Sequence, residues 1–232
     1  MAASPLETRP FPDGDALAMA LLSLLLESAA EAIRQRGRFV LSLAGGSSPL
    51  PLYRLLGETP ADWSRWFLLY GDERALPHGH PERNSTQVEQ LWLASANFPA
   101  TNHLLPDFSH GLDMASSRYE GLITPYLPPD VVLLGVGEDG HTASLFPERE
   151  MANAQGNSVL AVSDAPKAPP ERITLSYETL NSAAIVVFIA TGSNKRQAVT
   201  RMLAGDALPV NRIRGRQRSW LFLSGTVPTP GG

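Results

Sequence analysis

Cysteine is absent from the chain. Its absence excludes disulfide bonds, catalysis by a thiolate and zinc sites that need cysteine ligands. A chain without cysteine also suits a reducing compartment, where disulfide bonds would not persist. We therefore expect a cytoplasmic protein.

An excess of charge of either sign is lacking as well. Lys and Arg number 19, Asp and Glu number 23, and the net charge at pH 7 is −4. This balance gives no broad positive field, so we expect neither nucleic acid nor an anionic membrane surface as a partner. An anionic small molecule would instead have to be held by a few well-placed donors.

Long hydrophobic runs are few, and the one that could mislead is residues 16–26, ALAMALLSLLL. The run has the length of a signal-peptide core, but acidic residues precede it where a signal peptide needs positive charge. It is also too short to span a bilayer. The acidic start at Asp13 and the basic end at Arg36 suit a helix dipole, so we predict a largely buried helix that ends at Gly37.

The chain has 232 residues, a length that fits one α/β domain better than two, and we expect residues 1–232 to form a single domain. Apolar runs alternate with helical segments and end in loops rich in glycine or charge. This pattern is typical of a doubly wound, mostly parallel sheet with helices on both faces, a Rossmann-like three-layer α/β fold. The predicted strands are 38–43, 65–70, 131–136, 158–163, 172–176, 185–190 and 220–223, and the further predicted helices are 49–56, 84–95, 114–127 and one that begins at 195. We expect residues 148–155 to be a surface excursion.

The stretch 130–147, DVVLLGVGEDGHTASLFP, joins the most strand-like run to the densest cluster of reactive side chains. Gly137 and Gly140 punctuate the loop after the strand, and a crowded glycine loop lets backbone N–H groups approach a polar ligand closely. Asp139 and His141 lie where this loop opens. Because ligands of open α/β sheets bind outside the carboxyl ends of the strands, we expect a site here.

Three interpretations of this loop compete. GVGEDG matches the G-x-G-x-x-G pattern of dinucleotide-binding proteins, and Asp164 after a later strand mimics their acidic residue. That motif needs a long helix after the third glycine, whereas Pro147 follows seven residues later. The second interpretation is a tight turn with a structural histidine. The third, which we favour, is a catalytic histidine held on a glycine-shaped loop.

Residues 45–48, Gly-Gly-Ser-Ser, follow the strand 38–43 and precede Pro49, which suits the start of a helix. Backbone N–H groups at a helix N-terminus, with Ser47 and Ser48 as further donors, make a plausible phosphate cradle. No G-K-[ST] follows, so this is not a Walker A loop. A simple turn from strand to helix remains the alternative.

Charged residues also follow the strands 65–70 and 185–190. Asp72, Glu73 and Arg74 come directly after the first, and Lys195 opens the helix after the second. Charge runs are usually solvated, but the matching position at neighbouring strand ends favours a site for Asp72, Arg74 and Lys195.

A metal site is a weaker hypothesis. His78, His80 and Glu82 have a spacing that could bind a metal along an extended segment, but loop histidines between prolines are more often exposed. We expect no metal and no cofactor. We expect the basic run Arg212–Arg218 to be a solvated strand face and loop.

Four blocks together resemble the 6-phosphogluconolactonase family. They are LAGGSSP at 43–49, YGDER at 70–74, GVGEDGHTASLFP at 135–147 and ERITLS at 171–176. The third block is highly specific, whereas GGSSP alone would be weak. Members often carry Ser-Gly-Gly-Ser-Thr-Pro at the first block, so Ala44 and Ser48 depart from the pattern. Of the Ser-Asn pair that the family has near the start of the helix 84–95, only Asn84 is present.

The resemblance implies hydrolysis of 6-phospho-D-glucono-1,5-lactone in the oxidative pentose phosphate pathway by a carboxylic ester hydrolase. His141 would be the general base on the attacking water. Asp139 and Asp72 would orient the histidine or hold sugar hydroxyls, and Arg74 with the loop N–H groups of residues 137–140 would stabilise the oxyanion. The substrate-binding candidates are Gly45, Gly46, Ser47, Ser48, Asn84, Gly137, Gly140, Arg172 and Lys195. The partner would be the small sugar-phosphate lactone, and the protein a monomer or a small homo-oligomer.

Two alternative functions remain open. The related glucosamine-6-phosphate deaminases have a similar glycine loop and Asp-Gly-His block, but they carry an acidic residue five positions after the histidine, where this chain has Phe146. The other alternative is a non-catalytic sugar-phosphate sensor. Intact Asp72, Arg74, Asp139 and His141 argue against a sensor, because a protein that only binds has little need of a base.

Overall fold

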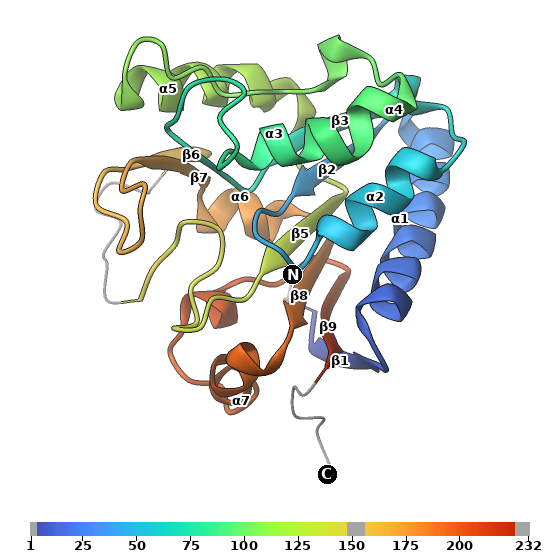
Figure 1. Ribbon diagram of the computed structural model, residues 1–232, viewed down its shortest axis with the longest axis vertical. Helices are drawn as coiled ribbons and strands as arrows, with labels where there is room; N and C mark the ends of the chain where they lie inside the picture. The colour runs from blue at the N-terminus through green and yellow to red at the C-terminus, as the bar shows by residue number, and fades with distance from the viewer. Residues whose placement is uncertain (1–3, 148–155, 226–232) are drawn as a thin grey trace.

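The computed structural model describes residues 4–147 and 156–225 (Figure 1). In this part of the chain, six strands form one parallel sheet in the order β1-β9-β8-β5-β2-β3. The strands are β1 (Leu6–Phe11), β2 (Phe39–Leu43), β3 (Trp66–Tyr70), β5 (Val131–Gly135), β8 (Ile185–Thr191) and β9 (Arg218–Ser224). The predicted surface excursion at residues 148–155 lies outside the described residues.

The chain reverses its direction of travel across this sheet between β2 and β5. After β2 the chain moves outward to β3, and it later returns to place β5 on the other side of β2. The two strands leave the sheet at Leu43 and Gly135, and the loops that follow them diverge. Such a switch point opens a crevice at the carboxyl ends of the strands, and this crevice positions the site.

Helices cover both faces of the sheet (Figure 1). Side chains alternate along each strand, so Phe39 and Leu41 of β2 belong to one hydrophobic cluster and Val40 to the other. The first cluster includes residues of α1 (Gly14–Arg36) and α2 (Leu50–Glu58), and the second includes residues of α5 (Leu112–Ile123), α6 (Tyr177–Ser182) and α7 (Arg196–Leu203). The predicted doubly wound, three-layer fold is confirmed.

Helix α1 begins and ends as the sequence predicts. The Asp13 side chain accepts a hydrogen bond from the N–H of Ala16, and Gly37 ends the helix with a left-handed φ of 75°. The helix is longer than its apolar run, and by length and composition alone it could cross a membrane. Its buried residues, among them Leu17 and Leu21, pack into the same cluster as Phe39 and Leu41 of β2, as in a core helix.

Three short strands in the described residues form a second, antiparallel sheet that was not predicted. They are β4 (Asp72–Arg74), β7 (Arg172–Leu175) and β6 (Val159–Val162), in the order β4-β7-β6. The segments of β6 and β7 were predicted as strands, but β4 was read as a charged loop because it has only three residues, all charged. Edge strand β1 was also missed, since Pro10 and two charged residues, Glu7 and Arg9, conceal its pattern.

The predicted helix at 84–95 is interrupted. It consists of α3 (Asn84–Val88), a π-helical turn at Glu89–Leu93 and α4 (Ala94–Ala96). The predicted helix at 114–127 starts and ends earlier, as α5, with a 3₁₀ turn at Thr124–Tyr126 before the prolines.

Candidate active site

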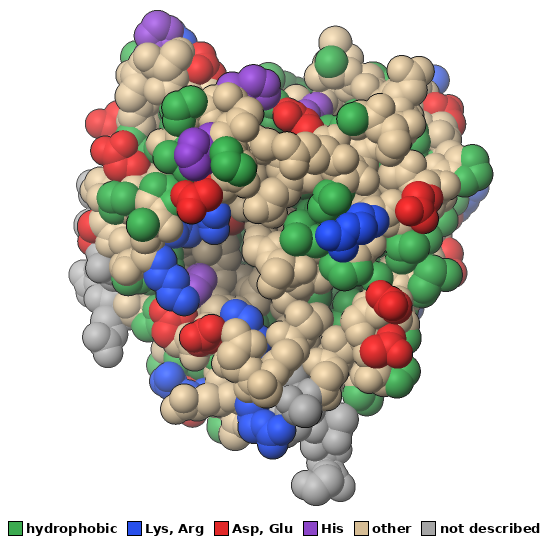
Figure 2. Space-filling view, in the orientation of Figure 1, with side chains coloured by type: hydrophobic (Ala, Val, Ile, Leu, Met, Phe, Trp, Pro, Cys, Tyr) green, Lys and Arg blue, Asp and Glu red, His purple; other side chains and the backbone are tan. Residues whose placement is uncertain are grey.

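A pocket of about 310 Å³ opens at the switch point. Figure 2 shows this face of the molecule, with Lys, Arg and His side chains gathered around a hollow. The backbone floor comes from the ends of β2 and β5, and the polar walls come from the loops and the small sheet. The predicted site residues that line the pocket are Gly45, Gly46, Ser47, Ser48, Asp72, Arg74, Asn84, Gly137, His141, Arg172 and Lys195.

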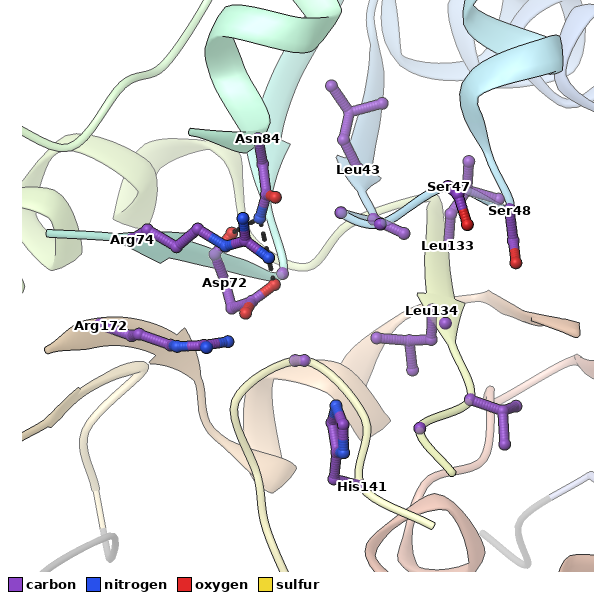
Figure 3. Close-up of a pocket in the computed structure, with 18 of the residues that line it drawn as sticks. Leu43, Ser47, Ser48, Asp72, Arg74, Asn84, Leu133, Leu134, His141 and Arg172 are labelled. Carbon is purple, nitrogen blue, oxygen red and sulfur yellow. Dashed lines mark hydrogen bonds between the residues drawn. The ribbon is translucent and has the colours of Figure 1, made fainter. Parts of the chain in front are cut away.

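The glycine-serine loop lies between β2 and α2 and packs very closely against Asn84. A Cβ atom on Gly45 would stand 2.2 Å from the Asn84 Oδ1 atom, so any side chain there would displace the Asn84 amide. Ser47 is exposed, and the Ser48 hydroxyl lies 2.8 Å from the Thr191 hydroxyl at the end of β8. The loop therefore presents two hydroxyls at the pocket wall, just before the helix (Figure 3).

His141 points into the pocket from the loop after β5 (Figure 3). Its Nδ1 atom lies 2.5 Å from the Asp139 Oδ1 atom, and its backbone N–H donates to the same oxygen at 3.1 Å. A carboxylate only accepts hydrogen bonds, so Nδ1 carries the proton in a neutral ring and Nε2 keeps its lone pair. The arrangement prepares Nε2 to accept a proton from a group in the pocket.

Asp139 supports the histidine from behind the pocket wall. Partial burial alone would raise its pKa, but the hydrogen bonds and the charge of His141 outweigh that effect and hold the pKa of this carboxyl below its ordinary value. Asp139 is therefore ionised at neutral pH and accepts the hydrogen bond from Nδ1 of His141. Of the two roles that the resemblance implies for Asp139, this contact suits orientation of the histidine.

The glycines of this loop do not serve as the predicted N–H donors. The N–H of Gly137 donates to the carbonyl of His141 at 2.8 Å, and the N–H of Gly140 donates to the carbonyl of Gly137 at 3.0 Å. Gly137 instead gives room to the imidazole, because a Cβ there would lie 2.1 Å from Nδ1. Gly140 lies outside the pocket lining, next to Leu208. The prediction of N–H donation by these two glycines is wrong.

Asp72 is buried, yet it lines the pocket. Its carboxylate accepts a hydrogen bond from the Ser144 hydroxyl at 2.6 Å, and the Asn84 amide donates to its Oδ1 at 3.4 Å and to its backbone carbonyl at 2.8 Å. Burial raises the pKa of Asp72 above its ordinary value, while Ser144 and the charge of Arg172 act in the opposite direction. The carboxylate is therefore a fixed acceptor at the pocket wall.

Arg74 and Arg172 bring two positive charges to the pocket from adjacent strands. The Nη1 atom of Arg74 donates to the carbonyl of Glu82 at 2.7 Å. The Nε and Nη2 atoms of Arg172 donate to the carbonyls of Pro169 and Lys167 at 3.0 and 2.8 Å. These bonds hold both guanidinium groups in place beside Asp72 (Figure 3).

Two lysines stand at another part of the pocket wall. Burial lowers the pKa of Lys195. The negative charge of Glu138 opposes this lowering, and the positive charge of Lys167 adds to it. Glu138 also accepts a hydrogen bond from the Asn194 amide at 2.8 Å. Lys195 was predicted as a site residue, but Lys167 was not, because its segment DAPKAPP reads as a simple loop.

Sequence reasoning also missed two buried residues that support the site. Glu73 accepts from the backbone N–H groups of Arg74 and Asn84 at 2.8 and 2.9 Å, and Ser144 bonds Asp72. Neither side chain lines the pocket. Their roles depend on contacts with residues distant in sequence, which no sequence motif indicates. The alternation of β4 gives the one usable signal, since Glu73 must point away from the face that Asp72 and Arg74 share.

The structure bears on two of the weaker interpretations, the dinucleotide-binding motif and the metal site. In residues 141–147 no helix follows Gly140; a tight turn closed by hydrogen bonds between Thr142 and Leu145 lies there instead. Among residues 4–147 and 156–225, no cluster of three His, Asp or Glu side chains could hold a metal ion. His80 accepts from the backbone N–H of Glu82 at 3.2 Å, as in an ordinary loop.

The fold and pocket define an α/β protein whose small-molecule site is walled by Arg74, Arg172, Lys167 and Lys195. A family model described as glucosamine-6-phosphate isomerases/6-phosphogluconolactonase matches residues 12–222. The chain belongs to this family.

Several relatives carry the second of these two names. A 6-phosphogluconolactonase of Streptomyces coelicolor is 36% identical over 232 aligned positions, covering 90% of this chain and 89% of its own. One of Nostoc sp. is 35% identical and covers 84% of each chain. The crystal structure of 6-phosphogluconolactonase from Thermotoga maritima superposes with a TM-score of 0.87 at 25% identity, over 95% of this chain and 100% of that one. A monomeric glucosamine-6-phosphate deaminase, 19% identical with a TM-score of 0.77, shares the fold.

Proposed function

We propose that the protein hydrolyses 6-phospho-D-glucono-1,5-lactone to 6-phospho-D-gluconate in the oxidative pentose phosphate pathway. The observation that carries this function is the His141 imidazole, whose Nδ1 is held by Asp139 while its ring lines a pocket with cationic walls. The family and the 6-phosphogluconolactonases among the relatives agree with it.

His141 acts first as a base. Nε2 takes a proton from a water molecule as the water oxygen attacks the lactone carbonyl carbon. The resulting tetrahedral intermediate collapses by breaking the bond to the ring oxygen, and the imidazolium returns the proton to that oxygen. Asp139 stabilises the imidazolium between these two steps, because its carboxylate accepts from Nδ1.

The remaining polar groups divide among the carbonyl oxygen, where an oxyanion develops, the phosphate and the sugar hydroxyls. Arg74 stabilises the oxyanion that develops on the carbonyl. The N–H groups of Gly137 and Gly140 do not serve this purpose, because both donate to backbone carbonyls of their own loop. Arg172, Lys195 and the loop of Ser47 and Ser48 hold the phosphate through charge-assisted hydrogen bonds. Lys167 supplies a further cation at the same wall. Asp72 accepts hydrogen bonds from sugar hydroxyls, and Asn84 donates to them.

One observation disfavours the deaminase alternative. The position five residues after the histidine, where deaminases carry an acid, is Phe146, which is 4% exposed. Its ring centroid lies 4.9 Å from that of His141, so it packs on the base. An apolar ring there offers no second proton-transfer group.

We also propose that residues 1–232 act as a single domain, because both hydrophobic clusters share the central sheet. The predicted partner is the small-molecule lactone. A cytoplasmic location, the absence of nucleic-acid and membrane partners, and a monomeric or small homo-oligomeric state remain predictions.

A direct comparison of two substrates tests the function. Freshly generated 6-phosphogluconolactone and glucosamine 6-phosphate are offered in parallel to the purified protein, with the spontaneous rate of lactone opening subtracted. We expect hydrolysis of the lactone well above the spontaneous rate and no release of ammonia. Ammonia release faster than lactone hydrolysis would replace the proposal by the deaminase function.

A further inference from the structure

A tight turn directly after the histidine brings the histidine loop into contact with strand β4. The N–H of Leu145 donates to the carbonyl of Thr142 at 2.9 Å, and the N–H of Thr142 donates back to the carbonyl of Leu145 at 3.3 Å. Ala143, at the centre of this turn, has a φ of 49°, a left-handed conformation that is unusual for a residue with a side chain. Such a conformation persists where the surrounding contacts impose it.

The contacts that impose this conformation converge on Ser144, which is completely buried. Its hydroxyl donates to the Asp72 Oδ2 atom at 2.6 Å. Its backbone N–H donates to the Thr174 hydroxyl at 3.3 Å, and Thr174 is the residue directly opposite Asp72 across β4 and β7. One residue of the histidine loop therefore contacts both strands that carry Asp72, Arg74 and Arg172.

We infer that Ser144 is a positioning residue for the lactone hydrolysis proposed above, because its hydroxyl holds the Asp72 carboxylate aimed into the pocket, in fixed register with His141. The inference deepens the proposed function and rests on it. It assigns to Ser144 no contact with the substrate, since its side chain lies outside the pocket lining.

The hydroxyl matters because Asp72 is in an unfavourable environment for a charge. Burial disfavours its ionised form, and the neighbouring Glu73 adds to that effect. The opposing groups are Ser144 on the loop, Arg172 on β7 and Arg74 on β4, with the Asn84 amide on α3 at 3.4 Å. A hydrogen bond to the charged form lowers a carboxyl pKa, so its loss moves protonation of Asp72 to higher pH.

The test compares Ser144→Ala with a matched control, Ser42→Ala. Ser42 is as deeply buried as Ser144, and its hydroxyl has no hydrogen-bond partner in the described residues. Carboxyl ¹³C NMR titration follows Asp72 directly, with its resonance assigned from Asp72→Asn. We expect its midpoint to rise by about one pH unit in Ser144→Ala and to stay unchanged in Ser42→Ala.

Activity supplies a second readout. The acid limb of the pH profile of kcat/KM reports both His141 and Asp72, and the part that follows Asp72 should move to higher pH in Ser144→Ala alone. If Ser144→Ala fails to fold, Ser144→Cys replaces it; its thiol is a weaker donor, so the midpoint should move in the same direction by less. An unchanged Asp72 midpoint in a folded Ser144 variant overturns the inference. Absence of lactone hydrolysis in the unmodified protein would overturn the proposed function instead, and the NMR titration remains interpretable in that case.

Discussion

Arg74 and Arg172 lie directly opposite each other in the antiparallel pair of β4 and β7. Directly opposed residues share one face of a sheet, and both guanidinium groups line the pocket. Like charges in this position destabilise a strand pair. Burial lowers the pKa of Arg172, Asp72 opposes this effect and Arg74 adds to it. The two positive charges therefore favour a bound anion, because the single negative charge of Asp72 neutralises them only in part.

An anionic ligand should bind through both arginines. We expect Arg74→Gln and Arg172→Gln each to weaken binding of the product, 6-phosphogluconate, by about 1.5–3 kcal/mol, the worth of a charge-assisted hydrogen bond. Arg172→Gln should also lower the melting temperature, because Arg172 holds the carbonyls of Lys167 and Pro169. Calorimetric titration and thermal unfolding measure the two effects. Full affinity in both variants would remove the arginines from the site.

The buried charge of Asp72 should lower the free energy of unfolding at neutral pH. Its folded-state pKa is raised, so the folded protein binds a proton more readily than the unfolded chain, and stability falls as pH rises through this range. Asp72→Asn stays neutral, and we expect its melting temperature at pH 7 to exceed that of the unmodified protein while its kcat/KM falls. The difference in melting temperature should shrink as the pH approaches 4, the ordinary range of an aspartate. A lower melting temperature for Asp72→Asn at pH 7 would contradict this expectation.

His103 should make the fold sensitive to acid. Its Nε2 atom lies 2.6 Å from the Tyr70 hydroxyl, and burial lowers its pKa to about 4. Between that value and the ordinary value of about 6.5, the unfolded chain binds a proton that the folded protein does not, so stability is lost as the pH falls. The loss amounts to about 3 kcal/mol. His103→Gln should flatten the dependence of the unfolding free energy on pH between 4 and 6.5, measured by urea unfolding, and an equally steep dependence would assign it to other groups.

The central strands were predictable, whereas the edges of the fold were not. Residues 131–136 form a valine- and leucine-rich apolar run because both faces of β5 are covered, and such burial leaves a clear pattern in the sequence. Strand β1 lies at an edge, where charges and proline are tolerated, so its pattern is weak. Strand β4 exists only through its pairing with β7, a contact distant in sequence.

The site divides in the same way. Ser47, Asp72, His141 and Lys195 were predictable, because each follows a strand that ends at the same edge of the sheet. Ser144, Glu73 and Lys167 were missed, since their positions follow from tertiary packing. The error at Gly137 and Gly140 has a similar cause, because hydrogen bonds closed within the loop engage their N–H groups.

Lys195 should recognise the phosphate rather than the lactone ring. It is half-buried at the pocket wall, directly before helix α7, whose N-terminal dipole adds to its charge. Lys195→Ala should lower kcat/KM for the phosphorylated lactone by the equivalent of about 1.5–3 kcal/mol. Slow turnover of unphosphorylated gluconolactone serves as the control and should hardly change. Equal losses on both lactones would show that Lys195 serves the chemistry or the fold.

The central claim is that His141 is the general base, and its most direct test is the kcat of His141→Ala on 6-phosphogluconolactone. The spontaneous rate is subtracted, and binding of 6-phosphogluconate confirms that the pocket is intact. We predict that kcat falls by about 10²- to 10⁴-fold while this binding survives. An unchanged kcat in the folded variant would contradict the account and place the base elsewhere, with Asp72 as the next candidate.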